Sequence, residues 1–153
     1  MKIFFSATSG FYGEGIRRFE GGDFNHTGFI LPNGEIIETT AELGVHKRAN
    51  IDCVVKRSIA VVQYNILIPN EEAGLAFLNA QIGKKYDKLA IFGILLQRDW
   101  EDDSQWYCSE LLAAWYKAVG LAIPSCEKNG RVGVRLTHAY THAMQHGQAV
   151  VLK

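Results

Sequence analysis

A turn signal between two β-prone runs is the feature that most constrains the fold of this chain. Residues 25–31 (NHTGFIL) and 35–39 (EIIET) flank a Pro-Asn-Gly sequence at positions 32–34. Two β-prone runs separated by such a turn are typical of a β-hairpin. The sequence therefore predicts two adjacent antiparallel strands in its first third.

The length of the hairpin loop decides which side chains share a face of the sheet. With a three-residue loop, Gly28 pairs with Glu38, and His26 and Glu38 become diagonal neighbours on one face, roughly 7–8 Å apart at the backbone. With a two-residue loop they lie on opposite faces, because side chains alternate along a strand. We favour the three-residue loop, since Gly34 suits its left-handed position and Gly28 leaves space opposite Glu38.

The remaining segments predict an α+β fold. Further strands are expected at 2–7, 51–56, 58–68 and 150–152, and helical segments at 14–19, 70–83, 89–96 and 137–146. In the second of these strands Cys53 alternates with Ile51 and Val55, so we expect it in the core. Together these elements predict an antiparallel sheet or barrel packed against helices, in a single domain spanning residues 1–153.

The segment 105–120 (QWYCSELLAAWYKAVG) predicts a helix that carries a cysteine near its start. One face at helical spacing contains Cys108, Leu111, Leu112, Trp115 and Val119. A helix that begins near Ser104 places Cys108 about one turn inside it, where the positive end of the helix dipole favours a thiolate. The alternative reading is that Cys108 is a small apolar residue on a buried stripe.

Composition excludes several classes of protein. Sixteen basic residues balance sixteen acidic ones in the 153-residue chain, so its charge does not favour nucleic-acid binding. Three widely spaced cysteines do not suggest a disulfide framework and suit a reducing compartment. We see no signal-peptide core and no run long enough to cross a membrane. We expect a soluble, cytoplasmic protein, with export by another machine left open.

Three histidines at positions 138, 142 and 146 suggest a metal site only at first sight. They span about 12 Å along a helix, so three imidazoles cannot converge on one ion. We expect them on a solvated helix face, and we predict no metal and no cofactor.

Cys108, His26 and Glu38 together match the requirements of nucleophilic catalysis. A thiol nucleophile needs a base that takes its proton and a third polar group that orients the base. Taken singly, His26 is also compatible with a partly exposed strand histidine, and Glu38 with a solvated carboxylate. The combination predicts a catalytic triad.

Several short motifs of the chain resemble a known family. They are HTGFI at 26–30, GEIIE at 34–38, GV at 44–45, GKKYD at 83–87 and YCSELL at 107–112. The pattern resembles the circularly permuted, papain-like branch of the NlpC superfamily typified by YiiX-like proteins, in which the histidine precedes the cysteine. The resemblance runs from about residue 5 to residue 120.

The resemblance implies a cysteine peptidase or amidase that needs no metal. Cys108 would be the nucleophile, His26 the base and Glu38 the orienting acid in the hydrolysis of amide bonds, often in cell-wall (peptidoglycan) peptides, through an acyl-enzyme. The oxyanion would be held by the backbone N–H of Cys108 and a second donor, Tyr86 or Tyr107.

Two alternatives stay open at this point. Related folds include lipid acyltransferases, for which the apolar segment 89–96 could line a lipid pocket. The chain could also be a catalytically idle binding or structural module. The oligomeric state is not predicted.

Overall fold

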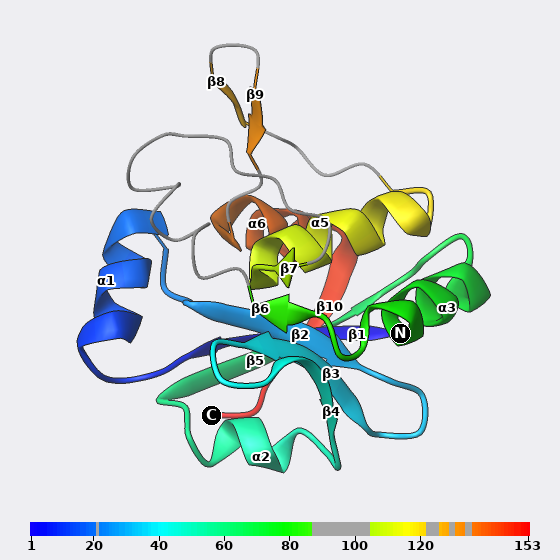
Figure 1. The fold of residues 1–153 in the computed structure, drawn as a ribbon. Coiled ribbons are helices and arrows are strands. Elements are labelled where there is room, and N and C mark those ends of the chain that lie inside the picture. Colours follow the sequence, from blue (N-terminus) through cyan, green and yellow to red (C-terminus); the bar gives the residue numbers. More distant parts are fainter. Residues whose placement is uncertain (21, 87–104, 122–125, 129–130, 134–135) are drawn as a thin grey trace.

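A six-stranded antiparallel sheet organises the computed structural model, which describes residues 1–20, 22–86, 105–121, 126–128, 131–133 and 136–153 (Figure 1). The strand order is β10-β5-β1-β2-β3-β4. The strands are β1 (Lys2–Ala7), β2 (His26–Ile30), β3 (Ile36–Thr40), β4 (Gly44–Arg48), β5 (Ala60–Ile66) and β10 (Gly147–Val151). The α+β class predicted from the sequence is therefore confirmed.

Helices lie on both faces of this sheet. Figure 1 shows α5 (Cys108–Ala118) and α6 (Leu136–His146) on one side and the short helix α2 (Asp52–Val55) on the other. Helix α3 (Glu71–Gln81) packs against α5, and α1 (Phe11–Glu20) lies beside the end of the sheet where β1 ends and β2 begins. Two small ladders, β6 (Lys85–Tyr86) with β7 (Gln105–Trp106) and β8 (Cys126–Lys128) with β9 (Arg131–Gly133), complete the described elements.

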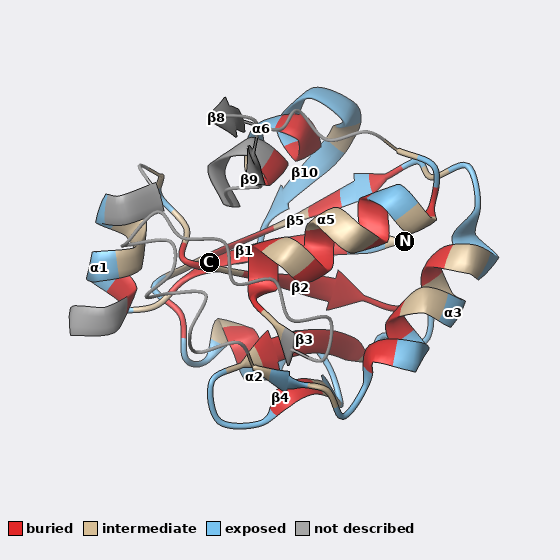
Figure 2. Ribbon diagram, turned by 45° about the horizontal axis from the view of Figure 1, so that its top comes forward, coloured by how far each residue is buried: buried red, intermediate tan, exposed pale blue. Residues whose placement is uncertain are grey.

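Figure 2 shows that the central strands β1, β2 and β3 are largely buried. Because side chains alternate along a strand, the core is divided into two layers. On the side that we call the α5 face, sheet residues including Ile3, Phe5, Phe29 and Ile37 pack in one cluster with Leu111, Leu112 and Trp115 of the helix. On the side that we call the α2 face, a second cluster contains Phe4, Ile30, Ile36, Val54 and Val61. Any strand residue can therefore be assigned to a face from its register.

The predicted hairpin is present with the three-residue loop. Gly28 pairs with Glu38, and Gly34 has a φ of +88°. The backbone N–H of Leu31 donates to the carbonyl of Glu35 at 2.8 Å, which closes the loop. A Cβ at position 28 would lie 2.7 Å from the Phe4 ring, so only glycine fits opposite Glu38.

The prediction of a strand at 51–56 is wrong. This segment forms α2, and Cys53 is exposed rather than part of the core. Ile51, Val54 and Val55 also have helical spacing, and these three residues pack on the α2 face. The sequence prediction also missed β4, which pairs with β3 at one edge of the sheet.

Helix α5 begins later than predicted. Cys108 is its first residue rather than lying a turn inside, and the proposed caps at 102–104 lie outside the described residues, as does the apolar segment 89–96. A carboxylate oxygen of Glu110 accepts a hydrogen bond from the backbone N–H of Tyr107 at 3.1 Å, which caps the helix start. The helix ends before Gly120, which has a φ of +81°.

The prediction that the three histidines of α6 lie on a solvated face is wrong for one of them. His142 is only 7% exposed, and its ring packs on the Tyr116 ring with the centroids 4.9 Å apart. Ala139 and Ala143 are fully buried, and such small residues let α5 and α6 approach closely enough to enclose His142.

None of the described helices is long and apolar enough to cross a membrane.

Candidate active site

Glu38 forms the centre of a charged cluster on the α2 face. Its side chain is fully buried, and its Oε2 lies 2.7 Å from Nε2 of His26. Nε of Arg48 donates to Oε1 at 2.6 Å, and Nη2 of Arg57 donates to Oε2. One carboxylate thus connects β2, β3, β4 and the segment that follows α2.

These partners keep Glu38 ionised despite its burial. Burial by itself would raise the pKa of the carboxyl group, because a charge is costly in a low dielectric. The hydrogen bond and charge of His26, the hydrogen bond of Arg48 and the charge of Arg57 outweigh that effect and hold the pKa of Glu38 well below its usual range. Glu38 is therefore a carboxylate at neutral pH.

A second histidine lies beside this carboxylate. In the sheet register His46 is directly opposite Glu38, and its Nε2 lies 3.5 Å from Oε1. Its Nδ1 is 2.9 Å from the carbonyl oxygen of Gly44, an oxygen that can only accept. Nδ1 of His46 is therefore protonated, and the ring is held along its own strand.

His26 is the first residue of β2 and lies at the rim of the sheet. It pairs with Ser6 of β1, and its ring is 5.9 Å from the Phe4 ring on the α2 face. Its side chain is 15% exposed. Because Glu38 can only accept, the contact makes Nε2 the protonated nitrogen and leaves Nδ1 as the basic one.

Asn25 fixes the backbone just before this histidine. Its Oδ1 accepts from the backbone N–H of Thr8 at 3.0 Å, and its Nδ2 donates to Oγ1 of the same residue at 3.0 Å. Asn25 is buried, so these contacts anchor the end of β1 to the start of β2. The position of His26 is therefore fixed through its backbone by Asn25 and through its side chain by Glu38.

Cys108 lies in a second cluster with the two predicted oxyanion residues. Tyr107 and Cys108 are both buried, at 2% and 3% exposure, and Tyr86 packs against them. The Tyr86 and Tyr107 rings are 5.9 Å apart in an edge-to-face arrangement. Cys108 is the first residue of α5 and therefore lies at the positive end of the helix dipole, which favours the thiolate.

Two contacts show where the start of α5 lies along the sheet. Oγ1 of Thr39 donates to the carbonyl oxygen of Trp106 at 3.2 Å, and the Trp115 ring is 5.1 Å from the Phe29 ring. Thr39 follows Glu38, which pairs with Gly28, so α5 begins near the end of β2 where His26 lies.

The predicted triad residues lie at one end of β2 but on two sides of it. His26 and Glu38 are brought together as the register predicted, on the α2 face. Cys108 belongs to α5, which packs on the opposite face.

Two residues of the site were missed by the sequence analysis. Arg48 and Arg57 are the strongest partners of Glu38 apart from His26. Arg48 lies two residues after His46 on β4, so recognition of that strand opposite β3 would have placed it on the same face. Arg57 had no such signal, because α2 alone brings it to Glu38.

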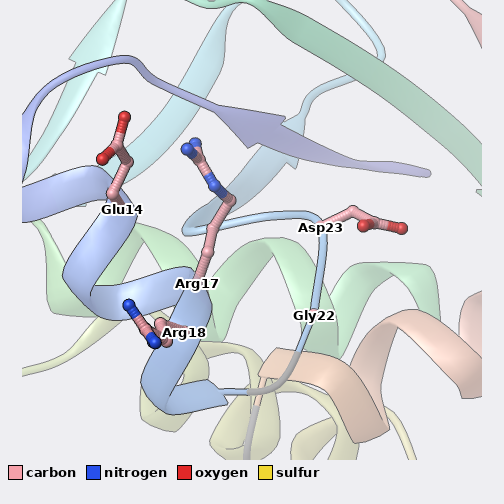
Figure 3. Close-up of a pocket in the computed structure, with 5 residues that line it drawn as sticks. All are labelled: Glu14, Arg17, Arg18, Gly22 and Asp23. Atoms are coloured by element: carbon pink, nitrogen blue, oxygen red, sulfur yellow. The ribbon is translucent and has the colours of Figure 1, made fainter.

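A pocket of about 510 Å³ lies between α1 and the segment leading to β2 (Figure 3). It is lined by Glu14, Arg17, Arg18, Gly22 and Asp23. Nη1 of Arg17 donates to the carbonyl oxygen of Thr8 at 2.7 Å, so this side chain also supports the anchor of His26. None of the predicted site residues lines this pocket.

The sheet with helices on both faces and a buried carboxylate–histidine pair at its rim defines an α+β domain. No family model and no curated protein matches the chain. Among solved structures, the crystal structure of the metalloprotein YiiX from Escherichia coli O157:H7 is similar, with 19% sequence identity and a TM-score of 0.61. The match covers 98% of this chain and 86% of that chain. The chain therefore has a YiiX-like fold.

Proposed function

We propose that this protein is a cysteine hydrolase of the peptidase or amidase type, with a permuted papain-like arrangement of Cys108, His26 and Glu38. The observation that carries the proposal is the contact of 2.7 Å between Nε2 of His26 and the buried carboxylate of Glu38, at the end of β2 where α5 begins with a cysteine. This is the base and orienting acid that a thiol nucleophile requires.

In the proposed reaction Nδ1 of His26 accepts the proton of the Cys108 thiol. The thiolate attacks the carbonyl carbon of an amide, and the oxyanion is held by the backbone N–H of Cys108 and the hydroxyl of Tyr86 or Tyr107. His26 then gives its proton to the leaving amine. Water hydrolyses the resulting thioester and restores the thiol. The reaction requires Sγ and the imidazole to meet around the end of β2.

The proposal uses no metal ion. The similar YiiX structure is described as that of a metalloprotein. In this chain the described residues contain no group of three or more His, Cys, Asp or Glu side chains that could hold a metal. The oxygens of Glu38 face Arg48 and Arg57, whose charges oppose a bound cation. The charged cluster therefore does not fit a metal, and we assign no step to one.

The reactivity of the cysteines tests the proposal sharply, because burial alone predicts the opposite result. Cys53 is exposed and Cys108 is 3% exposed, so steric access favours alkylation of Cys53. If Cys108 is an activated nucleophile, we expect mild iodoacetamide to label it faster than Cys53, as measured by peptide mass spectrometry. We expect His26→Ala to slow labelling of Cys108 at least tenfold and to leave Cys53 unchanged.

Activity is tested with a panel of peptidoglycan fragments and lipids, comparing the native chain with Cys108→Ala. Cleavage of a peptide amide that is lost in the variant supports the proposal. Release of fatty acid or acyl transfer would instead indicate the lipid acyltransferase that the sequence analysis left open.

One observation favours a second candidate, a ligand-binding module without catalysis. The His26 ring lies on the α2 face, away from the face that α5 covers. In an idle module the contact between His26 and Glu38 is purely structural. Labelling of Cys108 that is slower than that of Cys53 and independent of His26 would support this candidate.

A further inference from the structure

Two arginines from different elements converge on Glu38. Arg48 extends from β4 and Arg57 from the segment after α2, and both bind the same buried carboxylate. Glu38 accepts one N–H from each, namely Nε of Arg48 and Nη2 of Arg57. A guanidinium group has five N–H donors, so most donors of each arginine are not used by Glu38.

Both side chains are partly open to solvent on the side away from Glu38. The side chain of Arg48 is 31% exposed and that of Arg57 is 33% exposed, whereas the Glu38 side chain is fully buried. The buried carboxylate thus fixes two guanidinium groups, one on each of its oxygens. Rigid, pre-positioned donors of this kind suit the binding of a carboxylate, because the guanidinium fork matches the two oxygens.

The net charge of the cluster also favours a bound anion. One carboxylate is neutralised by one arginine, so the second leaves an excess positive charge, before either neighbouring histidine is counted. Two like charges held together in a partly buried site repel each other. A bound anion would relieve this repulsion.

We propose that Arg48 and Arg57 bind a carboxylate group of the substrate, so that the enzyme acts on amides of acidic peptides. This inference rests on the proposed hydrolase function. Arg57 and His26 share one oxygen of Glu38, so the bound carboxylate lies close to the base.

Binding of a matched pair of peptides tests the inference without turnover. The probes are acetyl-Ala-Glu-amide and acetyl-Ala-Gln-amide, which differ only in the charge of one side chain, titrated into the full chain by NMR or calorimetry. We expect the native chain to bind the Glu peptide at least tenfold more tightly than the Gln peptide. We expect added salt to reduce this preference.

Variants assign the preference to the two arginines. Arg48→Gln and Arg57→Gln should each abolish most of the preference, whereas Lys56→Gln, at an exposed neighbouring position, should leave it intact. Because the loss of a charge beside Glu38 reduces stability, Arg57→Lys serves as a second variant that keeps the charge and removes the guanidinium fork. We expect it to remain folded and to lose at least threefold of the preference.

The outcome separates this inference from the proposed function. Cys108→Ala should keep the preference for the Glu peptide, because binding needs no nucleophile. Equal binding of both peptides by the native chain overturns the inference, as does a full preference in Arg57→Lys. Neither result bears on the reactivity of Cys108, which tests the hydrolase proposal separately.

Discussion

Removal of the Glu38 carboxylate should destabilise the fold far more than removal of an exposed carboxylate on the same hairpin. Glu38 is fully buried and binds three charged or polar partners. Breaking a buried ion pair by removing one partner costs about 3–5 kcal/mol. Water can partly solvate Arg48 and Arg57, which are about one-third exposed, so we expect Glu38→Ala to cost about 3 kcal/mol, the lower end of that range.

Thermal and urea unfolding measure this cost. A loss of about 3 kcal/mol lowers the Tm of a domain of this size by roughly 6–12 °C. The matched control is Glu35→Ala, because Glu35 is 40% exposed and lies 3.7 Å from Lys47. Such a surface pair contributes about 0.2–1 kcal/mol. Equal and small losses in the two variants would refute the reasoning, since they would show that the cluster does not stabilise the fold.

The pH dependence of stability in a second variant, Glu38→Gln, gives an independent check. The partners of Glu38 hold its pKa in the folded state below that of the unfolded chain. The unfolded chain therefore takes up the proton first, and the stability that the carboxylate contributes is complete above the ordinary carboxyl range and is lost as the pH falls below it. We expect the difference in the free energy of unfolding between the native chain and Glu38→Gln to shrink as the pH falls below about 5. A difference that grows below that pH would contradict this account.

Three further predictions follow from single positions. Gly44→Ala should cost about 2 kcal/mol or more in urea unfolding, because φ is +65° there and a Cβ would lie 2.1 Å from the carbonyl oxygen of Lys84; an unchanged midpoint would contradict the geometry. Asn70→Ala should lower the free energy of unfolding by about 1 kcal/mol, because its side chain caps α3, and Asn70→Asp should restore most of it. Burial lowers the pKa of His142, so stability should fall as the pH drops below about 6.5; His142→Gln should flatten that decline, and an unchanged slope would show that another group is responsible.

The parts of the fold that the sequence predicted correctly depend on local chemistry. Gly28 and Gly34 set the register of the hairpin, and that register alone brings His26 and Glu38 together. Likewise Asn70 caps α3, and its Oδ1 accepts from the backbone N–H of Ala73 at 2.9 Å. In each case a few neighbouring residues are sufficient to determine the geometry.

The parts that were wrong depend on packing between distant segments. Residues 51–56 alternate as a strand does, yet their apolar residues also fit a helical turn, and only the apolar surface of the α2 face decides between them. Strand β4 contains three basic residues in five, and two of them, His46 and Arg48, lie beside Glu38, a long-range contact that its sequence does not indicate. His142 is enclosed because α6 packs on α5, which no local pattern reveals.

The site was predictable in its chemistry and not in its full geometry. The types of residue at positions 26, 38 and 108 suggested a catalytic triad, and the hairpin register predicted the contact between His26 and Glu38. The position of Cys108 depends on how α5 lies across the sheet, which contacts such as that between Thr39 and Trp106 determine. Contacts between residues so far apart in the sequence leave no periodic signal in it.

The order of strands in the sheet has a consequence for how the chain assembles. Strands β2, β3 and β4 follow one another through short connections, whereas the pairing of β5 with β1 closes a much longer loop, since Asn65 pairs with Lys2. Closure of a long loop costs more entropy than closure of a short one. In pulse-labelling of refolding chains, amides of the three-strand meander should thus acquire protection first. The ionic cluster around Glu38 is completed only when Arg57 arrives, so the early meander forms before its central charge is fully compensated.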